Sequence, residues 1–157
     1  MNTFLELSVK SEPSFLEQQT SSFLGSISSQ AKPAPAKQYT YSMNTKHICL
    51  LYERNFKVMT TFSPPQFGSA FSASVLSNLS FDELIHVIFG GSRAIVTVLD
   101  HESDGRIAIA VESLVGFYED PDSGAVVLDV ISSQTGTIEQ VETKSTMQSV
   151  HELIRGV

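Results

Sequence analysis

The sequence has little of what stabilises secreted domains or anchors membrane proteins. It has one cysteine, Cys49, so no disulfide can form within the chain and the fold must depend on the burial of apolar side chains. This is typical of a reducing compartment, and we predict a cytoplasmic protein. The longest apolar run is interrupted by His86, and the first residues lack the basic and apolar regions of a signal peptide. We therefore predict no association with membranes.

Basic residues are also scarce, and no two of them are adjacent. From Asp100 to the end, eleven acids stand against three bases, a balance of −8, whereas the preceding residues sum to +1. Because such a surface repels phosphates, we predict no nucleic-acid binding through the C-terminal half. Cations or basic protein surfaces suit it better as partners.

With 157 residues, of which 41% are hydrophobic, the chain can form one domain of ordinary size and an appendage. Residues 1–42 are rich in Ser, Gln, Pro and Ala and lack sustained periodicity, so we predict a flexible N-terminal arm. Residues 43–157 are predicted to form a single globular domain.

Within the predicted arm, Ser14 and Glu17 have the spacing of a capping box, which indicates a short helix over 14–24. Such a helix would bury its apolar side chains only against a partner surface. These side chains are Phe15, Leu16 and Phe23. The segment "AKPAPA", 31–36, is predicted to be an extended linker. Two interpretations stay open, a disordered tail and an arm that docks on a neighbouring subunit or partner.

Alternation of apolar and polar residues predicts a series of β-strands after residue 42. Segments 47–53 and 56–62, joined by Arg54-Asn55, indicate a hairpin that ends before a Pro-Pro pair, and 71–75 indicates a further strand. Four more strands are predicted at 94–99, 107–118, 125–131 and 137–143. Because the links are rich in Asp, Ser, Pro and Gly, we predict an antiparallel meander of six or seven strands.

The clearest helix is predicted over 80–89, "SFDELIHVIF". Ser80 and Glu83 have the spacing of a capping box, and Gly90-Gly91 supplies a stop signal. Because apolar residues occupy much of its circumference, we expect this helix to be covered on most sides. His86 is then expected to be a hydrogen-bonded residue of the core or of an interface.

A second helix is predicted at the C-terminal end, in "STMQSVHELIRG", where Ser145 and Gln148 have the spacing of another capping box. Its apolar stripe consists of Met147, Val150, Leu153 and Ile154. The predicted fold class is therefore α+β, a mostly antiparallel β-meander sheet with one central and one C-terminal helix, preceded by the flexible arm.

Several segments of the C-terminal half follow a known order: "IVTVL", a turn with glycine, "AVESLVGFYED", "AVVLDVISSQTG", "IEQVETKS" and the helix "MQSVHELI". In this order, residues 94–155 resemble the small FlbD-like proteins found among bacterial flagellar genes and in phages. The chain departs from that pattern at Val111, where the family usually carries Asn. The resemblance implies a small, oligomeric binding or regulatory module from a bacterium or its virus, associated with the virion in the second case.

The segment "DHESDG" raises the question of a metal site, because Asp100, Glu102 and Asp104 occupy positions one, three and five of an EF-hand loop. Position twelve is Val111 in place of the bidentate Glu, and the flanks are predicted strands. We therefore favour a solvated hairpin turn, and a weak cation site at the three acids stays open. The next acidic turn, 119–122, is predicted to lie at the opposite end of the meander.

No combination of residues indicates an enzyme. The four histidines lack the spacing of a zinc pair, and Cys49 lies in the apolar segment "HICLLY", where a thiol is more often buried than reactive. The segment "FGGSRA" lacks the lysine of a phosphate-binding loop, and we predict no cofactor.

The sequence thus favours a non-enzymatic binding or assembly module that forms oligomers, with the arm docking on a neighbour. The alternative is a regulatory protein that binds a small ligand or a divalent cation between subunits. The predicted contact residues are Phe15, Leu16, Phe23 and His86.

Overall fold

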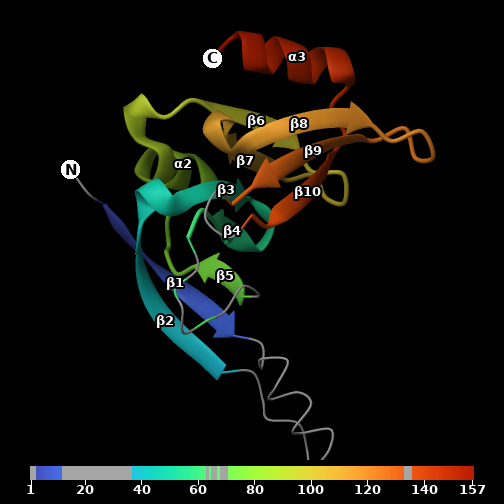
Figure 1. The fold of residues 1–157 in the computed structure, drawn as a ribbon. Helices are drawn as coiled ribbons and strands as arrows, with labels where there is room; N and C mark the ends of the chain where they lie inside the picture. Colours follow the sequence, from blue (N-terminus) through green and yellow to red (C-terminus); the bar gives the residue numbers. More distant parts are fainter. Residues whose placement is uncertain (1–2, 12–36, 63, 65–66, 68–70, 133–135) are drawn as a thin grey trace, which may run out of the picture.

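The computed structural model describes residues 3–11, 37–62, 64, 67, 71–132 and 136–157, and its strands form two antiparallel sheets (Figure 1). The larger sheet has the order β2-β1-β5-β4-β3-β7-β6 and the smaller has the order β10-β9-β8. The larger sheet comprises β1 (Phe4–Ser11), β2 (Lys37–Asn44), β3 (Ile48–Tyr52), β4 (Lys57–Thr60), β5 (Phe71–Val75), β6 (Ile95–Leu99) and β7 (Arg106–Ala110). The smaller comprises β8 (Leu114–Glu119), β9 (Val126–Ile131) and β10 (Ile138–Thr143). The helices of the described residues are α2 (Phe81–Phe89) and α3 (Met147–Arg155), so the predicted α+β class is confirmed.

The strand predicted over 107–118 is broken, and the single meander becomes two sheets. A 3-10 turn, η5 (Val111–Ser113), carries the chain from β7 in the larger sheet to β8 in the smaller one. Arg93 holds this turn, because its Nε and Nη2 donate to one carboxylate oxygen of Glu112 at 3.0 and 2.7 Å. The same guanidinium donates to the carbonyl of Thr45 at 3.2 Å, which links η5 to the segment between β2 and β3.

A second link between the sheets lies where β6 and β10 end. Asp100 and Thr143 form an antiparallel bridge, and the Thr143 hydroxyl donates to the carbonyl of Leu99 at 2.7 Å. The amide of Lys144 donates to the same carbonyl at 3.0 Å. The chain therefore joins the sheets through η5, and hydrogen bonds join them again at this bridge.

The predicted flexible arm over 1–42 needs correction at both of its ends. β1 and β2 pair over eight residues, and Figure 1 shows them as a long two-stranded ribbon. Leu7 and Val9 of β1 are fully buried, so this strand is part of the core. The predicted helix over 14–24, the linker over 31–36 and the contact residues Phe15, Leu16 and Phe23 lie outside the described residues.

The predicted hairpin of β3 and β4 is confirmed, and its tip has two residues with a left-handed backbone, Asn55 and Phe56, the latter with φ 48°. Asn55 has φ 58°, which Asn tolerates better than most residues, and its side chain accepts from the amide of Lys57 at 3.2 Å. The predicted strand over 71–75 is also confirmed as β5, which pairs with both β1 and β4. β5 therefore connects the pair of β1 and β2 to the hairpin of β3 and β4 within the larger sheet.

Helix α2 begins and ends as predicted. The Ser80 hydroxyl accepts from the Glu83 amide at 3.4 Å, the Glu83 carboxylate accepts from the Ser80 amide at 2.8 Å, and Gly90 with φ 55° ends the helix. The expectation of cover on most sides is wrong, because the helix has a buried face and an exposed one. The buried residues are Phe81, Leu84, Ile88 and Phe89. His86 is exposed, so it is not a core residue.

Helix α3 is confirmed, but its first cap lies one residue later than predicted. Thr146, in place of Ser145, accepts from the amide of Ser149 at 3.2 Å. Val150 is the fully buried residue of this helix, and it joins a core that includes residues of both sheets and of α2. Both sheets and both helices therefore share one core.

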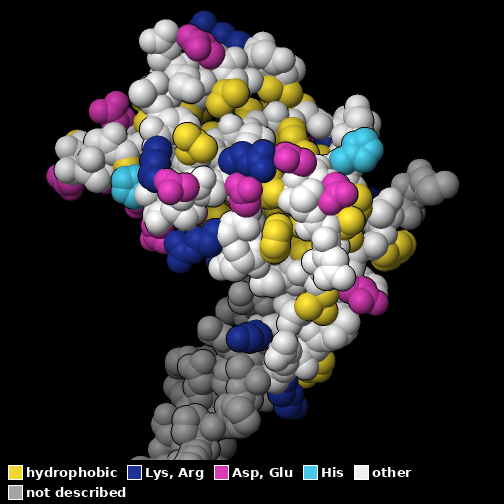
Figure 2. Space-filling view, turned by 180° about the vertical axis from the view of Figure 1, so that it is seen from behind, with side chains coloured by type: hydrophobic (Ala, Val, Ile, Leu, Met, Phe, Trp, Pro, Cys, Tyr) yellow, Lys and Arg dark blue, Asp and Glu magenta, His cyan; other side chains and the backbone are white. Residues whose placement is uncertain are grey.

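Figure 2 shows the face that is turned away from the viewer in Figure 1, where cationic and acidic side chains lie beside one another with apolar side chains between them. Charges of both signs in such proximity largely cancel at a distance, so this face has little preference for a partner of one sign.

Candidate functional site

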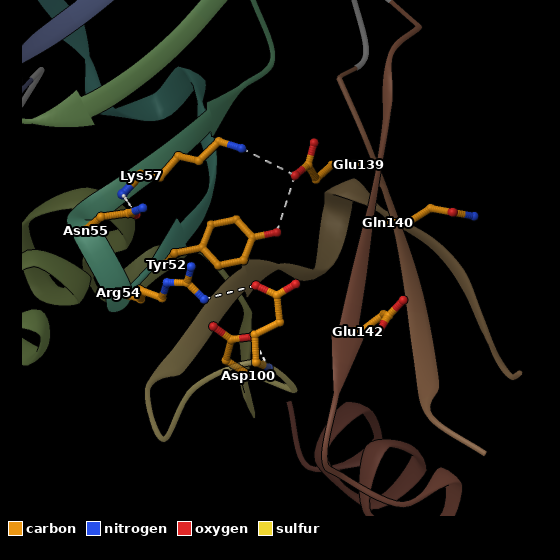
Figure 3. Close-up of a pocket in the computed structure, with 9 residues that line it drawn as sticks. Tyr52, Arg54, Asn55, Lys57, Asp100, Glu139, Gln140 and Glu142 are labelled. Atoms are coloured by element: carbon orange, nitrogen blue, oxygen red, sulfur yellow. Dashed lines mark hydrogen bonds and ion pairs between the residues drawn. The ribbon is translucent and has the colours of Figure 1, made fainter. Parts of the chain in front are cut away.

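A cleft of about 330 Å³ lies between the hairpin of β3 and β4 and the strand β10 of the other sheet (Figure 3). We call it the β10 cleft. Its lining residues are Tyr52, Arg54, Asn55, Lys57, Asp100, Glu102, Glu139, Gln140 and Glu142. Four of these carry carboxylates and two carry cations, so the lining has a formal charge of −2 at neutral pH. Four of the eleven acids that the sequence places in the C-terminal half thus lie where the two sheets face each other.

The hairpin side of the cleft presents an aromatic ring and a cation to Glu139. The Tyr52 hydroxyl donates to the Glu139 carboxylate at 3.4 Å, and the Lys57 ammonium lies 3.6 Å from the same oxygen (Figure 3). The ammonium also lies 5.8 Å from the centre of the Tyr52 ring. Burial and the negative charge of Glu139 raise the pKa of Tyr52 well above its ordinary value. Tyr52 is therefore a neutral hydrogen-bond donor at any physiological pH.

The β10 side of the cleft differs between its two faces. Glu139 points toward Tyr52 and Lys57, whereas Gln140 and Glu142 project from the opposite face of the strand (Figure 3). The Gln140 amide is held by Asp129 at 3.3 Å. The Glu142 carboxylate is exposed and forms no hydrogen bond or ion pair within the part of the chain that the structure describes. It is the lining carboxylate that stays available to a cation from outside.

The acidic turn "DHESDG" forms one end of the cleft, and hydrogen bonds within the turn hold it. Asp100 is only 8% exposed, and its carboxylate accepts from the amide of Glu102 at 3.0 Å and from the hydroxyl of Ser103 at 2.9 Å. Glu102 pairs with Arg54 at 3.0 Å, and Asp104 pairs with the ammonium of Lys144 at 3.3 Å. The three acids considered for a weak cation site thus engage three different sets of donors. Over the described ranges, no group of three or more His, Cys, Asp or Glu side chains is placed to hold a metal ion.

The remaining candidate residues lie away from the cleft or outside the described chain. His86 is exposed on α2 and does not line the cleft, while Phe15, Leu16 and Phe23 fall among the residues that the structure does not describe. Of these four predicted contact residues, the structure describes only His86, and it lies away from the cleft.

Cys49 lies in the core, as its apolar neighbours in the sequence indicate. It is fully buried, and its Sγ donates to the carbonyl of Met59 at 3.3 Å. Burial raises the pKa of the Cys49 thiol to about 11. The thiol is therefore protonated at neutral pH and is a poor nucleophile.

Sequence reasoning missed the residues that define the cleft, namely Tyr52, Lys57, Glu139 and Glu142. Tyr52 and Glu139 are 87 positions apart and belong to different sheets, so no local spacing connects them. The available signal was the excess of acids after residue 100, which correctly indicated an acidic surface but not its location.

Comparison with known proteins found no match among protein-family models, curated proteins or solved structures. The resemblance of residues 94–155 to FlbD-like proteins therefore stays a prediction. Within the described residues, neither helix has the length and apolar character needed to cross a bilayer.

Proposed function

We propose that this chain is a non-enzymatic binding and assembly module, which takes a basic segment of a protein partner in the β10 cleft. The observation that carries the proposal is the charge of the lining, −2, together with the free carboxylate of Glu142. Arg54 and Lys57 each already have an acidic partner, so a cation from outside can engage Glu142 without displacing them.

The cleft suits a lysine or arginine side chain better than a free ion. A carboxylate at the edge of a cleft attracts a cation more strongly than one on open surface, because part of the surrounding water is replaced by protein. A long basic side chain can also bury its methylene groups while its charge stays at the opening.

The chemistry of the described residues supports binding over catalysis. The cysteine is buried and protonated, and the Tyr52 phenol is held neutral. The carboxylates of Asp100, Glu102 and Glu139 are engaged by hydrogen bonds or ion pairs that keep them in place. Fixed charges of this kind recognise a charged group and leave it chemically unchanged.

The proposal can be tested by titrating the protein with a tetralysine peptide while recording amide resonances by NMR. We expect shifts at Tyr52, Glu139 and Glu142, and no such shifts with a tetraglutamate peptide. Glu142→Gln should weaken tetralysine binding by about fivefold, which corresponds to an exposed ion pair of about 1 kcal/mol. Glu119→Gln is the matched control, because it removes the same charge from β8, outside the cleft.

Two outcomes would contradict the proposal. If both variants lose the same affinity, tetralysine responds only to the net charge of the protein. If the shifts spread over the whole acidic half, the cleft has no particular affinity for the peptide. Sedimentation velocity of the same samples over a range of concentrations would test whether the chain self-associates.

A further inference from the structure

Strand β10 has one edge that its own sheet does not use. On one side, β10 pairs with β9 over all six of its residues. On the other side, within the described chain, it meets a strand neighbour only at the bridge between Asp100 and Thr143. The rest of this edge runs along the β10 cleft, because Glu139, Gln140 and Glu142 line it.

The hydrogen bonds at the bridge show which backbone groups point toward this edge. The carbonyl of Glu142 accepts from the amide of His101 at 3.1 Å, and the amide of Lys144 donates to the carbonyl of Leu99 at 3.0 Å. Backbone groups of successive strand residues alternate between the two edges. The amide and carbonyl of Gln140, two residues before Glu142, therefore point toward the same edge, as do those of Ile138. Neither residue's backbone has a bonding partner there among the described residues.

We infer that an extended, basic segment of a partner protein adds to β10 as a fourth strand of the smaller sheet, pairing with the backbone of Ile138 and Gln140. The inference rests on the proposed function and specifies how the basic segment is held. Unpaired backbone groups on a strand edge are a template for another strand, and side chains on either face then supply specificity. The bridge at Thr143 limits the added strand to the edge of Ile138–Glu142.

The two faces of β10 predict which residues the added strand carries. Side chains on one face would meet Glu142 and Gln140, where a lysine or arginine finds the free carboxylate. Side chains on the other face would meet Glu139 with its two donors, Tyr52 and Lys57, where a small polar residue avoids a clash of cations. The preferred sequence therefore alternates basic with small polar residues over about five positions.

Hydrogen exchange with the peptide acetyl-Thr-Lys-Thr-Lys-Thr-amide tests this mode of binding. In the free protein the amides of Ile138 and Gln140 should exchange fast, and those of Glu139 and Val141, which point toward β9, should exchange slowly. At saturating peptide, exchange at Gln140 should slow by at least about tenfold, because its amide gains a backbone acceptor. If the Gln140 amide stays fast while the peptide is bound, strand addition is overturned.

Peptides methylated on backbone nitrogens give a second test that needs no change in the protein. Methylation of both lysines and methylation of the first, third and fifth residues block opposite edges of the added strand. We expect one of these two peptides to lose at least about tenfold in affinity and the other to bind nearly as well as the unmodified peptide. Equal affinities for the two would also overturn strand addition. The proposed function survives that result if the unmodified peptide still binds and Glu142→Gln still weakens it, and it fails if no peptide binds.

Discussion

Asp100 and Asp120 hold their turns with the same set of hydrogen bonds. Each carboxylate accepts from the amide two residues later, at 3.0 Å in the first turn and 3.1 Å in the second. Each also accepts from the hydroxyl of a serine three residues later, Ser103 at 2.9 Å and Ser123 at 2.7 Å. That serine in turn accepts from the amide two residues further on. The chain thus uses one aspartate and serine turn twice, once beside the cleft and once between β8 and β9.

The first prediction compares these two aspartates. Asp100→Ala should destabilise the protein by about 1–2 kcal/mol, because Asp100 is buried and the substitution leaves two hydrogen-bond donors of the turn without their acceptor. Asp120→Ala should cost clearly less, since Asp120 lies in an exposed turn where water replaces the lost acceptor. Urea unfolding of both variants measures the difference. Equal losses would mean that the burial of Asp100 does not add to the contribution of its hydrogen bonds.

The second prediction concerns the link between the two sheets. Thr143 is 1% exposed, and its hydroxyl donates to the carbonyl of Leu99 and accepts from the amide of Ser145 at 3.0 Å. Thr143→Val keeps the shape but removes both bonds, so we expect a loss of about 1–3 kcal/mol in the free energy of unfolding. Thr40→Val on the exposed part of β2 is the control and should change stability little. If the free energy of unfolding of Thr143→Val equals that of wild type, the hydrogen bonds at the bridge do not contribute to stability.

The third prediction concerns the dependence of stability on pH. Arg106 donates to both carboxylate oxygens of Glu53, and these hydrogen bonds hold the pKa of Glu53 below its ordinary value. A lowered pKa adds stability that is present above the pKa of the unfolded chain and is lost as the pH falls through the folded value. Wild type should therefore be more stable than Glu53→Gln near neutral pH, and this gap should narrow between about pH 5 and about pH 3. Thermal melts across this range measure the gap.

The control for this experiment is Glu119→Gln, because Glu119 has no ion pair within the described chain. If the gap for Glu53→Gln widens as the pH falls, the pairing with Arg106 does not stabilise the ionised carboxylate, and the expectation is wrong.

The fourth prediction concerns the reactivity of the cysteine. With a pKa of about 11 against an ordinary 9.0, Cys49 has about a hundredfold less thiolate at neutral pH than a free thiol. Burial slows the reaction with Ellman's reagent further. We expect the native protein to react at least about a hundredfold more slowly than protein unfolded in guanidinium. Rapid reaction of the native protein would mean that β3 opens more readily than its burial indicates.

The sequence predicted those parts of the fold that depend on near neighbours. The capping box of Ser80 and Glu83 and the turn at Asn55 are local hydrogen bonds, so the spacing of the residues reveals them. Strand β1 was not predicted, although its sequence contains the signal for a strand. Leu5, Leu7 and Val9 alternate with polar residues, as apolar residues do in the later strands. The unusual composition of the following segment hid this signal.

The division into two sheets and the cleft between them could not be predicted in the same way. The break at η5 depends on Arg93, which reaches Glu112 from nineteen positions away in the chain. The cleft depends on contacts between the β3 hairpin and β10 that exist only once both sheets have formed. Composition predicted that the C-terminal half would be acidic, but only the fold brings Glu139 opposite Tyr52 and places Glu142 in the lining of the same cleft.

The pairing of β1 with β2 has a consequence for protein engineering. Ser11 and Lys37 are partners at the end of the ladder, so the segment that joins them has to span only the distance between two adjacent strands, about 5 Å. A two-residue turn meets that requirement as well as residues 12–36 do. The position is therefore suited to a shortened loop, or to an inserted guest sequence, without any change in the register of the seven-stranded sheet.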